Sequence, residues 1–136
     1  MIIAVRIAGQ IRVRRTQKST LESLMLKRKY TAIVVSENEL PRLKSVKDLI
    51  TFGEIDDESL KELVIKRGKK GKKSISNADE IVKGLKSGKR LRELGINPFF
   101  TLHPPRGGFK QSTKLPYPNG VLGNNKDILK LVKKML

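Results

Sequence analysis

The first 55 residues alternate strand and helix signals at short spacing, and this alternation constrains the fold more than any other feature. Met1–Ala8 is apolar and rich in β-branched residues, as a strand buried on both faces of a sheet would be. Ala32–Val35 and Leu49–Phe52 give two further strand signals, and an apolar stripe from Leu40 to Val46 predicts a short helix between them. Together with a helix between the first two strands, this order predicts a compact α/β unit with helices covering one face of its sheet.

The helix between the first two strands is predicted from an apolar stripe that ends at Met25. Either Thr16 or Ser19 can cap its N-terminus, because Ser19 and Glu22 match a capping box and Thr16 is an equally good cap. The cations Lys27–Lys29 suit the negative end of the helix dipole. We therefore expect a helix that starts at a hydroxyl side chain and ends near its own basic cluster.

Another helix is predicted directly after the third strand, capped by Asp56 or Asp57 and ended by Gly68, which we expect to adopt a left-handed conformation. With Glu54 and Glu58 nearby, four carboxylates gather at its start, which is also the composition of a metal site. Carboxylates are favoured at a helix N-terminus in any case, so we interpret the cluster as structural.

The rest of the chain gives weaker signals. A helix starts near Asn77 and is expected to break at Gly84 and Gly88, and Phe99–Leu102 is predicted as a strand. Residues 103–123 contain four prolines and are expected to form a loop. A terminal helix follows, capped by one of two neighbouring asparagines, Asn124 or Asn125.

The charge balance points to an anionic partner. The chain has 30 Lys and Arg residues against 13 Asp and Glu, a formal net charge of +17, and such self-repulsion disfavours a compact state unless a polyanion is near. Nucleic acid fits better than a membrane surface, because the main basic run has no large apolar anchors and no apolar run is long enough to span a bilayer. Ile2 and Ile3 open the chain without the basic stretch of a signal peptide, so we expect a cytosolic protein.

The residue types that are missing argue against catalysis. The chain has no cysteine and one histidine, which excludes disulfides, thiolate chemistry and cysteine-based or multi-histidine metal sites. Gly84–Arg90 is one residue short of a phosphate-binding loop and lacks its hydroxyl, and no glycine-elbow serine accompanies His103. We therefore expect no enzymatic activity, no cofactor and no metal.

The strongest candidate contacts are basic residues beside glycines. Lys66–Lys73 has six basic residues in eight, and Gly68 and Gly71 would let its backbone follow a phosphate ridge. A solvated lysine face in a heat-adapted protein would predict matching glutamate enrichment, which is absent. The predicted RNA-binding residues are Arg12, Arg14, Arg15, Lys18, Lys66, Arg67, Lys69, Lys70, Lys72, Lys73, Lys89, Arg90, His103, Arg106, Gly107, Gly108, Lys110 and Lys114.

Two other functions stay open on these residues. Residues 76–96 could form a helix-turn-helix with Lys89–Arg92 as a short recognition helix, which would make the chain a DNA-binding or chromatin protein. An accessory subunit of an RNA-processing enzyme is the weaker alternative. RNA gripped through its backbone and shape fits better than readout of single-stranded bases, because the strands carry few aromatic residues.

One segment resembles a known family. Leu102-His-Pro-Pro-Arg-Gly-Gly-Phe109, followed by Lys110 and a basic terminal helix, is similar to the C-terminal signature of the large-subunit ribosomal protein family called L-thirty in archaea and bacteria and L-seven in eukaryotes. Leu63–Gly68 and Gly88–Leu91 resemble further stretches of its longer form, and the missing basic N-terminal extension indicates the archaeal type.

Membership of that family implies the fold and the role. It implies an α+β fold with a ferredoxin-like βαβαβ core over residues 1–55 and a basic extension over 56–136 that packs on the core and ends in a C-terminal helix. It also implies a structural, non-catalytic protein of the cytoplasmic ribosome that holds large-subunit ribosomal RNA. The expected partners include the small ribosomal RNA of the central protuberance and neighbouring ribosomal proteins.

The motif also makes physical sense as an RNA contact. Pro104 and Pro105 keep the chain extended, and Gly107 and Gly108 let backbone amides approach phosphates. Arg106 offers a planar fork for phosphate oxygens, and His103 can stack or donate. The alternative is a rigid loop that closes the edge of the sheet, and both interpretations can hold together.

Overall fold

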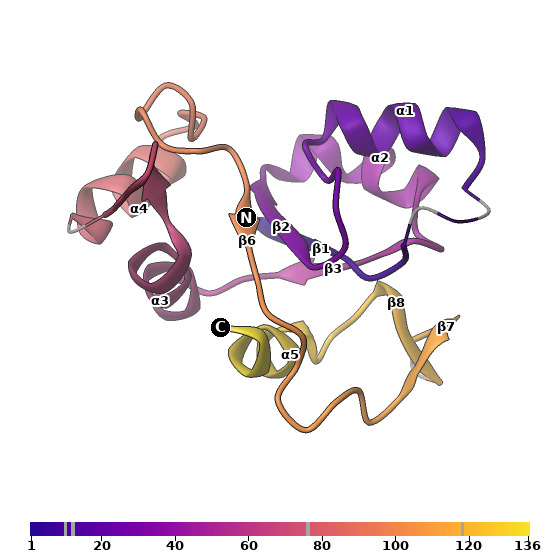
Figure 1. The fold of residues 1–136 in the computed structure, drawn as a ribbon. Helices are drawn as coiled ribbons and strands as arrows, with labels where there is room; N and C mark the ends of the chain where they lie inside the picture. The colour runs from indigo at the N-terminus through magenta and orange to yellow at the C-terminus, as the bar shows by residue number, and fades with distance from the viewer. Residues whose placement is uncertain (10, 12, 76, 118) are drawn as a thin grey trace.

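The computed structural model describes residues 1–9, 11, 13–75, 77–117 and 119–136. Within these residues the main sheet has the strand order β6-β2-β1-β3-β8-β7, and β4 and β5 form a separate two-stranded sheet (Figure 1). The strands are β1 Ile2–Arg6, β2 Thr31–Val35, β3 Ile50–Glu54, β4 Lys69–Lys70, β5 Lys73–Ser74, β6 Phe100–Thr101, β7 Ser112–Pro116 and β8 Gly120–Asn124. The α-helices are α1 Arg15–Ser23, α2 Leu40–Ser45, α3 Asp57–Arg67, α4 Ala78–Lys86 and α5 Ile128–Met135, and a 3₁₀ turn, η1, covers Glu37–Glu39.

The first strand lies at the centre of the sheet. β1 pairs antiparallel with β2 on one side and with β3 on the other, so that Ile3 lies between Val34 and Gly53. All five residues of β1 are buried. The prediction of a strand buried on both faces is confirmed, because an apolar run without alternation suits neither an edge nor a half-exposed position.

Helices cover both faces of the sheet. In Figure 1, α1 and α2 lie on one face, and α5 lies on the opposite side of β1–β3. Alternate residues of β1 point into two apolar clusters: Ile2 and Ala4 pack with Leu21 of α1 and Leu43 of α2, whereas the second cluster contains Ile3 together with residues of α3, α4 and α5. This mixed arrangement confirms the predicted α+β, ferredoxin-like class. No helix in the described ranges combines the length and apolarity that crossing a membrane requires.

Residues 56–136 contribute to the same core as residues 1–55. β8 extends the sheet in parallel beside β3, with Thr51 opposite Gly123, and β6 extends the other edge beside β2. The second apolar cluster therefore joins strands of the first part to helices of the second. The division of the chain into a core over residues 1–55 and an extension over 56–136 stays a prediction.

The ends of α1 differ from the prediction. The helix begins at Arg15 with Arg14 as N-cap and without a side-chain cap, so neither Thr16 nor Ser19 caps it. The helix ends at Ser23, with Leu24 as its C-cap, because Met25 takes a positive φ of 64°, which turns the chain and leaves Lys27–Lys29 beyond the last turn. A methionine in the left-handed region leaves no signal in the sequence, since this conformation favours glycine.

Two glycines were also assigned wrongly. Gly68 ends α3 but is not left-handed: its φ is −66° and its ψ 136°, and a Cβ there would clash with the carbonyl of Val64. Gly84 does not break α4, which runs through it; a Cβ would lie 2.8 Å from the Leu94 side chain. Both positions therefore permit close packing. Of the glycines 68, 84 and 88, Gly88 alone has a left-handed conformation, with a φ of 89°.

The segment after residue 103 is less irregular than predicted. It contains two paired strands, β7 and β8, where a loop was expected. The N-cap of α5 is Asp127, whereas the side-chain oxygen of Asn125 accepts a hydrogen bond from the Asp127 N–H at 2.8 Å just before the helix. The prolines and glycines of this segment hid a buried strand, β8, whose pairing with β3 is set by tertiary contact.

Candidate nucleic-acid interface

The run of lysines after α3 forms a hairpin. β4 pairs antiparallel with β5, Lys70 lies opposite Lys73, and Gly71 at the turn has a φ of 66°. The side chains of Lys69, Lys70, Lys72 and Lys73 are exposed. None of these four ammonium groups has a carboxylate partner among the described residues, so the hairpin presents unneutralised positive charge.

The hairpin is held against the segment that precedes β6. The backbone N–H of Asn97 donates to the carbonyl oxygen of Lys69 at 2.9 Å, and its side-chain amide donates to that of Gly71 at 3.4 Å. The Lys70 side chain also passes over Gly95. Because the backbone is fixed at several points, the lysines project from a defined surface instead of a free loop.

Two carboxylates at the starts of α3 and α4 form ion pairs between these helices. Lys61 of α3 binds Asp79 of α4 at 2.8 Å, and Lys86 of α4 binds Asp57 at 2.5 Å. The first ion pair raises the pKa of Lys61 and lowers that of Asp79, chiefly through the hydrogen bond between them. These carboxylates therefore join α3 to α4 and leave the hairpin uncompensated.

Lys66 and Arg67 differ from the hairpin lysines. Lys66 binds Glu62 one turn earlier in α3 at 2.9 Å, so its charge is partly neutralised. Arg67 is half-buried, and its Nε is buried without a hydrogen-bond partner in the described residues. The first predicted cation is thus engaged within the protein, and the second is partly enclosed.

The 103–109 loop is bound to the end of α5. The backbone N–H groups of His103 and Arg106 donate to the carbonyl oxygens of Met135 and Lys134, each at 3.0 Å. These carbonyls belong to the last turn of a helix, where no intrahelical donor is available. Pro105, within the loop, is buried. The backbone hydrogen bonds therefore hold the loop to the end of α5, and closure of the edge of the sheet stays a prediction.

The side chains of this loop face outward. His103 and Arg106 are exposed, as are the two glycines that follow, and Gly107 and Gly108 have φ of 77° and 75° with open space where a Cβ would stand. The ring of Phe109 stacks on Tyr30 with centroids 6.3 Å apart, which fixes the far end of the loop. Lys110 and Lys114 follow and are also exposed.

A third basic group lies at the start of α1. Arg14, Arg15 and Lys18 are exposed there, and Arg12 lies outside the described residues. In Figure 1, α1 is on the opposite face of the sheet from α5, and α3 and α4 lie to one side. The structure therefore brings the hairpin close to the 95–97 segment, but the predicted contacts form several groups instead of one site. Besides these three groups, Lys89 and Arg90 are exposed in the segment after α4 and line a pocket beside β2.

Sequence reasoning missed Arg6. This arginine lies in the central strand with 3% of its surface exposed, and its guanidinium donates to four backbone carbonyls of the 8–9 and 26–27 segments. Burial lowers its pKa. A lone cation inside an apolar strand was the available signal, because such a group must find buried acceptors.

The alternative functions find less support. Lys89–Arg92, which was considered as a recognition helix, is irregular at 89–90 and forms a turn from 91, so the segment lacks the second helix of a helix-turn-helix. In the acidic cluster, Asp56 caps α3 by accepting from the Ser59 N–H at 3.1 Å. Within the described ranges, no three His, Cys, Asp or Glu residues are grouped to hold a metal ion.

Curated relatives with one common name align with this chain over almost its whole length. No family model matches the chain. It is 40% identical to the large ribosomal subunit protein uL30 of Staphylothermus marinus, over 97% of this chain and 96% of that protein. It is 38% identical to uL30 of Aeropyrum pernix, over 97% and 96%, and 35% identical to uL30 of Archaeoglobus fulgidus, over 99% of each. The resemblance read from the residues around Arg106 is confirmed, and the chain belongs to the uL30 family in its archaeal type.

Proposed function

We propose that this chain is a non-catalytic structural constituent of the large ribosomal subunit in the cytoplasm, and that its basic surface binds and stabilises folded ribosomal RNA. The structural ribosomal role follows from relatives that are named as large ribosomal subunit proteins and align end to end with this chain. The proposed partners are large-subunit ribosomal RNA, the small ribosomal RNA of the central protuberance and neighbouring ribosomal proteins.

The hairpin carries the proposal for RNA binding. Four exposed lysines, at positions 69, 70, 72 and 73, lie on a fixed two-stranded hairpin with no carboxylate partner in the described structure. Concentrating like charges is unfavourable in isolation. It becomes favourable when the lysines neutralise phosphates and release the counterions condensed on a nucleic acid. The hairpin is therefore the part of the surface best suited to the RNA backbone.

The 103–110 segment offers a second contact of different chemistry. Arg106 projects from a loop whose backbone is already fixed to α5, so its fork loses little freedom on binding a phosphate. The open space beside Gly107 and Gly108 admits a nucleic-acid backbone. We include as further contacts the exposed residues Arg14, Arg15, Lys18, Lys89, His103, Lys110 and Lys114.

The test is filter binding to protein-free large-subunit RNA at a series of salt concentrations. If six to ten phosphates are engaged, affinity falls by about 10³ to 10⁵ between 50 and 200 mM salt. Replacing the four hairpin lysines by alanine should reduce the slope of log affinity against log salt by about 0.7–0.9 for each phosphate that the variant no longer neutralises.

A matched variant controls for net charge. Arg28, Lys44, Lys47 and Lys126 are exposed and lie outside the proposed contacts, so replacing them by alanine removes the same charge. We expect this variant to keep nearly the wild-type salt slope. Equal losses of affinity in both variants would show that only net charge matters, and a nearly salt-independent affinity would reject phosphate binding altogether.

A second comparison isolates the loop. Arg106→Ala should weaken RNA binding more than Lys134→Ala, with little change in the thermal melting of either free protein, because the hydrogen bond between these two residues involves only their backbone atoms. A charged hydrogen bond contributes about 1.5–3 kcal/mol, and a surface lysine near phosphate contributes less. If Arg106→Ala unfolds the free protein, or Lys134→Ala is equal or worse for binding, the loop has only a structural role.

A further inference from the structure

A groove lies at the edge of the main sheet, beside the open half of β2. β6 pairs with Thr31 and Ala32 of β2 and stops there. Continuing the same register would place Phe99 beside Ile33 and Pro98 beside Val34, but this pairing is absent, and Pro98 has no N–H to donate. Within the described chain, the outer side of Ile33–Val35 therefore has no neighbouring strand.

The two walls of the groove come from segments that are far apart in the sequence. One wall comes from the end of α1 and from η1 and α2, including Leu24 and Arg42, and the other from the end of α4 and residues 88–92, including Leu85 and Leu91. The groove has a volume of about 480 Å³. Apolar residues line it next to the strand edge, which is the arrangement that an added strand fills in β-augmentation.

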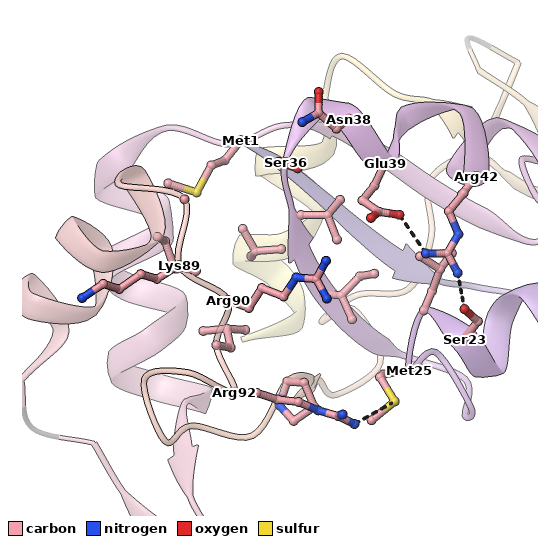
Figure 2. A pocket seen from close by; sticks show the side chains of 18 residues that line it. Met1, Ser23, Met25, Ser36, Asn38, Glu39, Arg42, Lys89, Arg90 and Arg92 are labelled. Carbon is pink, nitrogen blue, oxygen red and sulfur yellow. Dashed lines mark hydrogen bonds and ion pairs between the residues drawn. The ribbon is translucent and has the colours of Figure 1, made fainter.

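The groove is strongly basic at its rim. Figure 2 shows Arg90 extending across it toward the side formed by Glu39 and Arg42, and Arg92 reaching Met25, to whose sulfur it donates at 3.7 Å. Glu39 is the single carboxylate among the described lining residues, and it already binds Arg42 at 2.9 Å. The guanidinium of Arg90 has no carboxylate partner in the described residues.

We propose that this groove binds an extended acidic segment of a partner protein, which adds a strand to the open edge of β2 and places a carboxylate on Arg90. An unpaired strand edge supplies backbone donors and acceptors, and the apolar lining accepts alternate side chains of the incoming segment. An RNA phosphate backbone can neither pair with a strand edge as an added strand nor fill an apolar lining. The observations therefore favour a polypeptide over RNA. The net charge of +17 disfavours a second copy of this chain as the occupant.

The test uses a blocked six-residue peptide of alternating glutamate and valine, added to the isotope-labelled full chain and followed by NMR. Three open residues span about 10 Å of strand, so six residues suffice to cover them. We expect saturable shifts at the backbone amides of Ile33, Val34 and Val35. The same peptide with lysine in place of glutamate, and a version with N-methylated valines, should bind at least tenfold more weakly.

Two neighbouring residues provide a matched pair of variants. Figure 2 shows that the ammonium end of Lys89 points away from Arg90, although both residues line the groove, are exposed and are adjacent in sequence. Arg90→Ala should weaken peptide binding about tenfold or more, whereas Lys89→Ala, with the same change of net charge, should change it less than twofold. Thermal melting of each free variant checks that the fold is intact.

Other outcomes overturn the proposal. If hexauridylate shifts the Ile33–Val35 amides and the acidic peptide does not, the groove is an RNA contact. Equal effects of the two variants, or equal binding of the lysine peptide, would show non-specific attraction instead of a docked strand. Loss of RNA binding by the hairpin variant has no bearing on these measurements, so this proposal and the proposed function fail separately.

Discussion

Replacing the buried arginine of the central strand tests how the two turns beside the sheet are held. Arg6 donates to the carbonyl oxygens of Leu26 at 2.7 Å, Lys27 and Ala8 at 3.0 Å, and Gly9 at 3.2 Å. Among the described residues no carboxylate takes part, so the positive charge is stabilised by carbonyl dipoles from segments about 20 residues apart. Arg6→Met keeps a long side chain of similar reach but removes all four donors.

The expected loss of stability depends on which carbonyl acceptors are left without a hydrogen bond. The bond to Leu26 is buried, whereas the other three are partly buried and their carbonyls can bind water once the guanidinium is gone. Leaving one buried acceptor unsatisfied costs about 1–3 kcal/mol, and each hydrogen bond to a charged group contributes about 1.5–3 kcal/mol. Part of this loss is offset, because methionine has no charge that must be removed from water on folding. We therefore expect Arg6→Met to destabilise the fold by about 3 kcal/mol in total.

Urea unfolding followed by circular dichroism measures this loss, with Arg42→Met as the control. Arg42 is exposed and binds Glu39 and the Ser23 hydroxyl, so its removal should cost no more than about 1 kcal/mol. Hydrogen exchange should also accelerate at the turns around Gly9 and Leu26. If Arg6→Met stays within about 0.5 kcal/mol of the wild type, the four hydrogen bonds do not stabilise the fold as argued.

Three further changes test the packing and capping of the fold by the same unfolding measurement. Gly53→Ala should destabilise by about 2 kcal/mol, because its Cβ would lie 2.6 Å from the carbonyl oxygen of Asn125; a neutral result would mean that β8 and α5 can shift. Asp56→Ala should cost about 1 kcal/mol by removing the N-cap of α3. Hydrogen bonds from Ser59 lower the pKa of Asp56 in the folded protein. The stability that the ionised cap contributes is therefore present above the ordinary pKa of 3.8 and is lost as pH falls through the lower folded pKa. An equal difference in stability between Asp56→Ala and the wild type at pH 7 and pH 2 would contradict this. Thr51→Val should stabilise by about 1 kcal/mol, since the buried hydroxyl has no partner in the described residues, and a loss of stability would reveal one.

The strands within residues 1–55 were predictable because their apolar residues indicate which positions are buried. Met1–Ala8 is apolar without alternation, and such a run is stable only with other elements on both faces. The identities of Met25 and Tyr30 gave no comparable signal, although both take positive φ, near 64° and 62°. Their conformations are imposed by the chain reversals that return α1 to β2, and tertiary contacts outweigh the local preference there.

The candidate site was predictable in composition and not in arrangement. The lysines of 66–73 were expected to be exposed, and those of the hairpin are, but nothing in the run indicated a hairpin bonded to Asn97. Lys66 was predicted as an RNA contact like the lysines that follow it. In the structure it forms an ion pair with Glu62, because a helix places residues four apart side by side. The direction of Arg90 depends on where the turns after α4 meet the edge of β2, which no local pattern records.

The 103–109 loop shows why its two interpretations are compatible. Its backbone donors at His103 and Arg106 are used to satisfy the terminal carbonyls of α5, and that bonding would be broken if the backbone turned toward a ligand. The side chains of the same two residues remain exposed and take no part in it. A ligand can therefore use the Arg106 guanidinium without loosening the helix end, and the rigidity that closes the fold also limits the entropy that binding would cost.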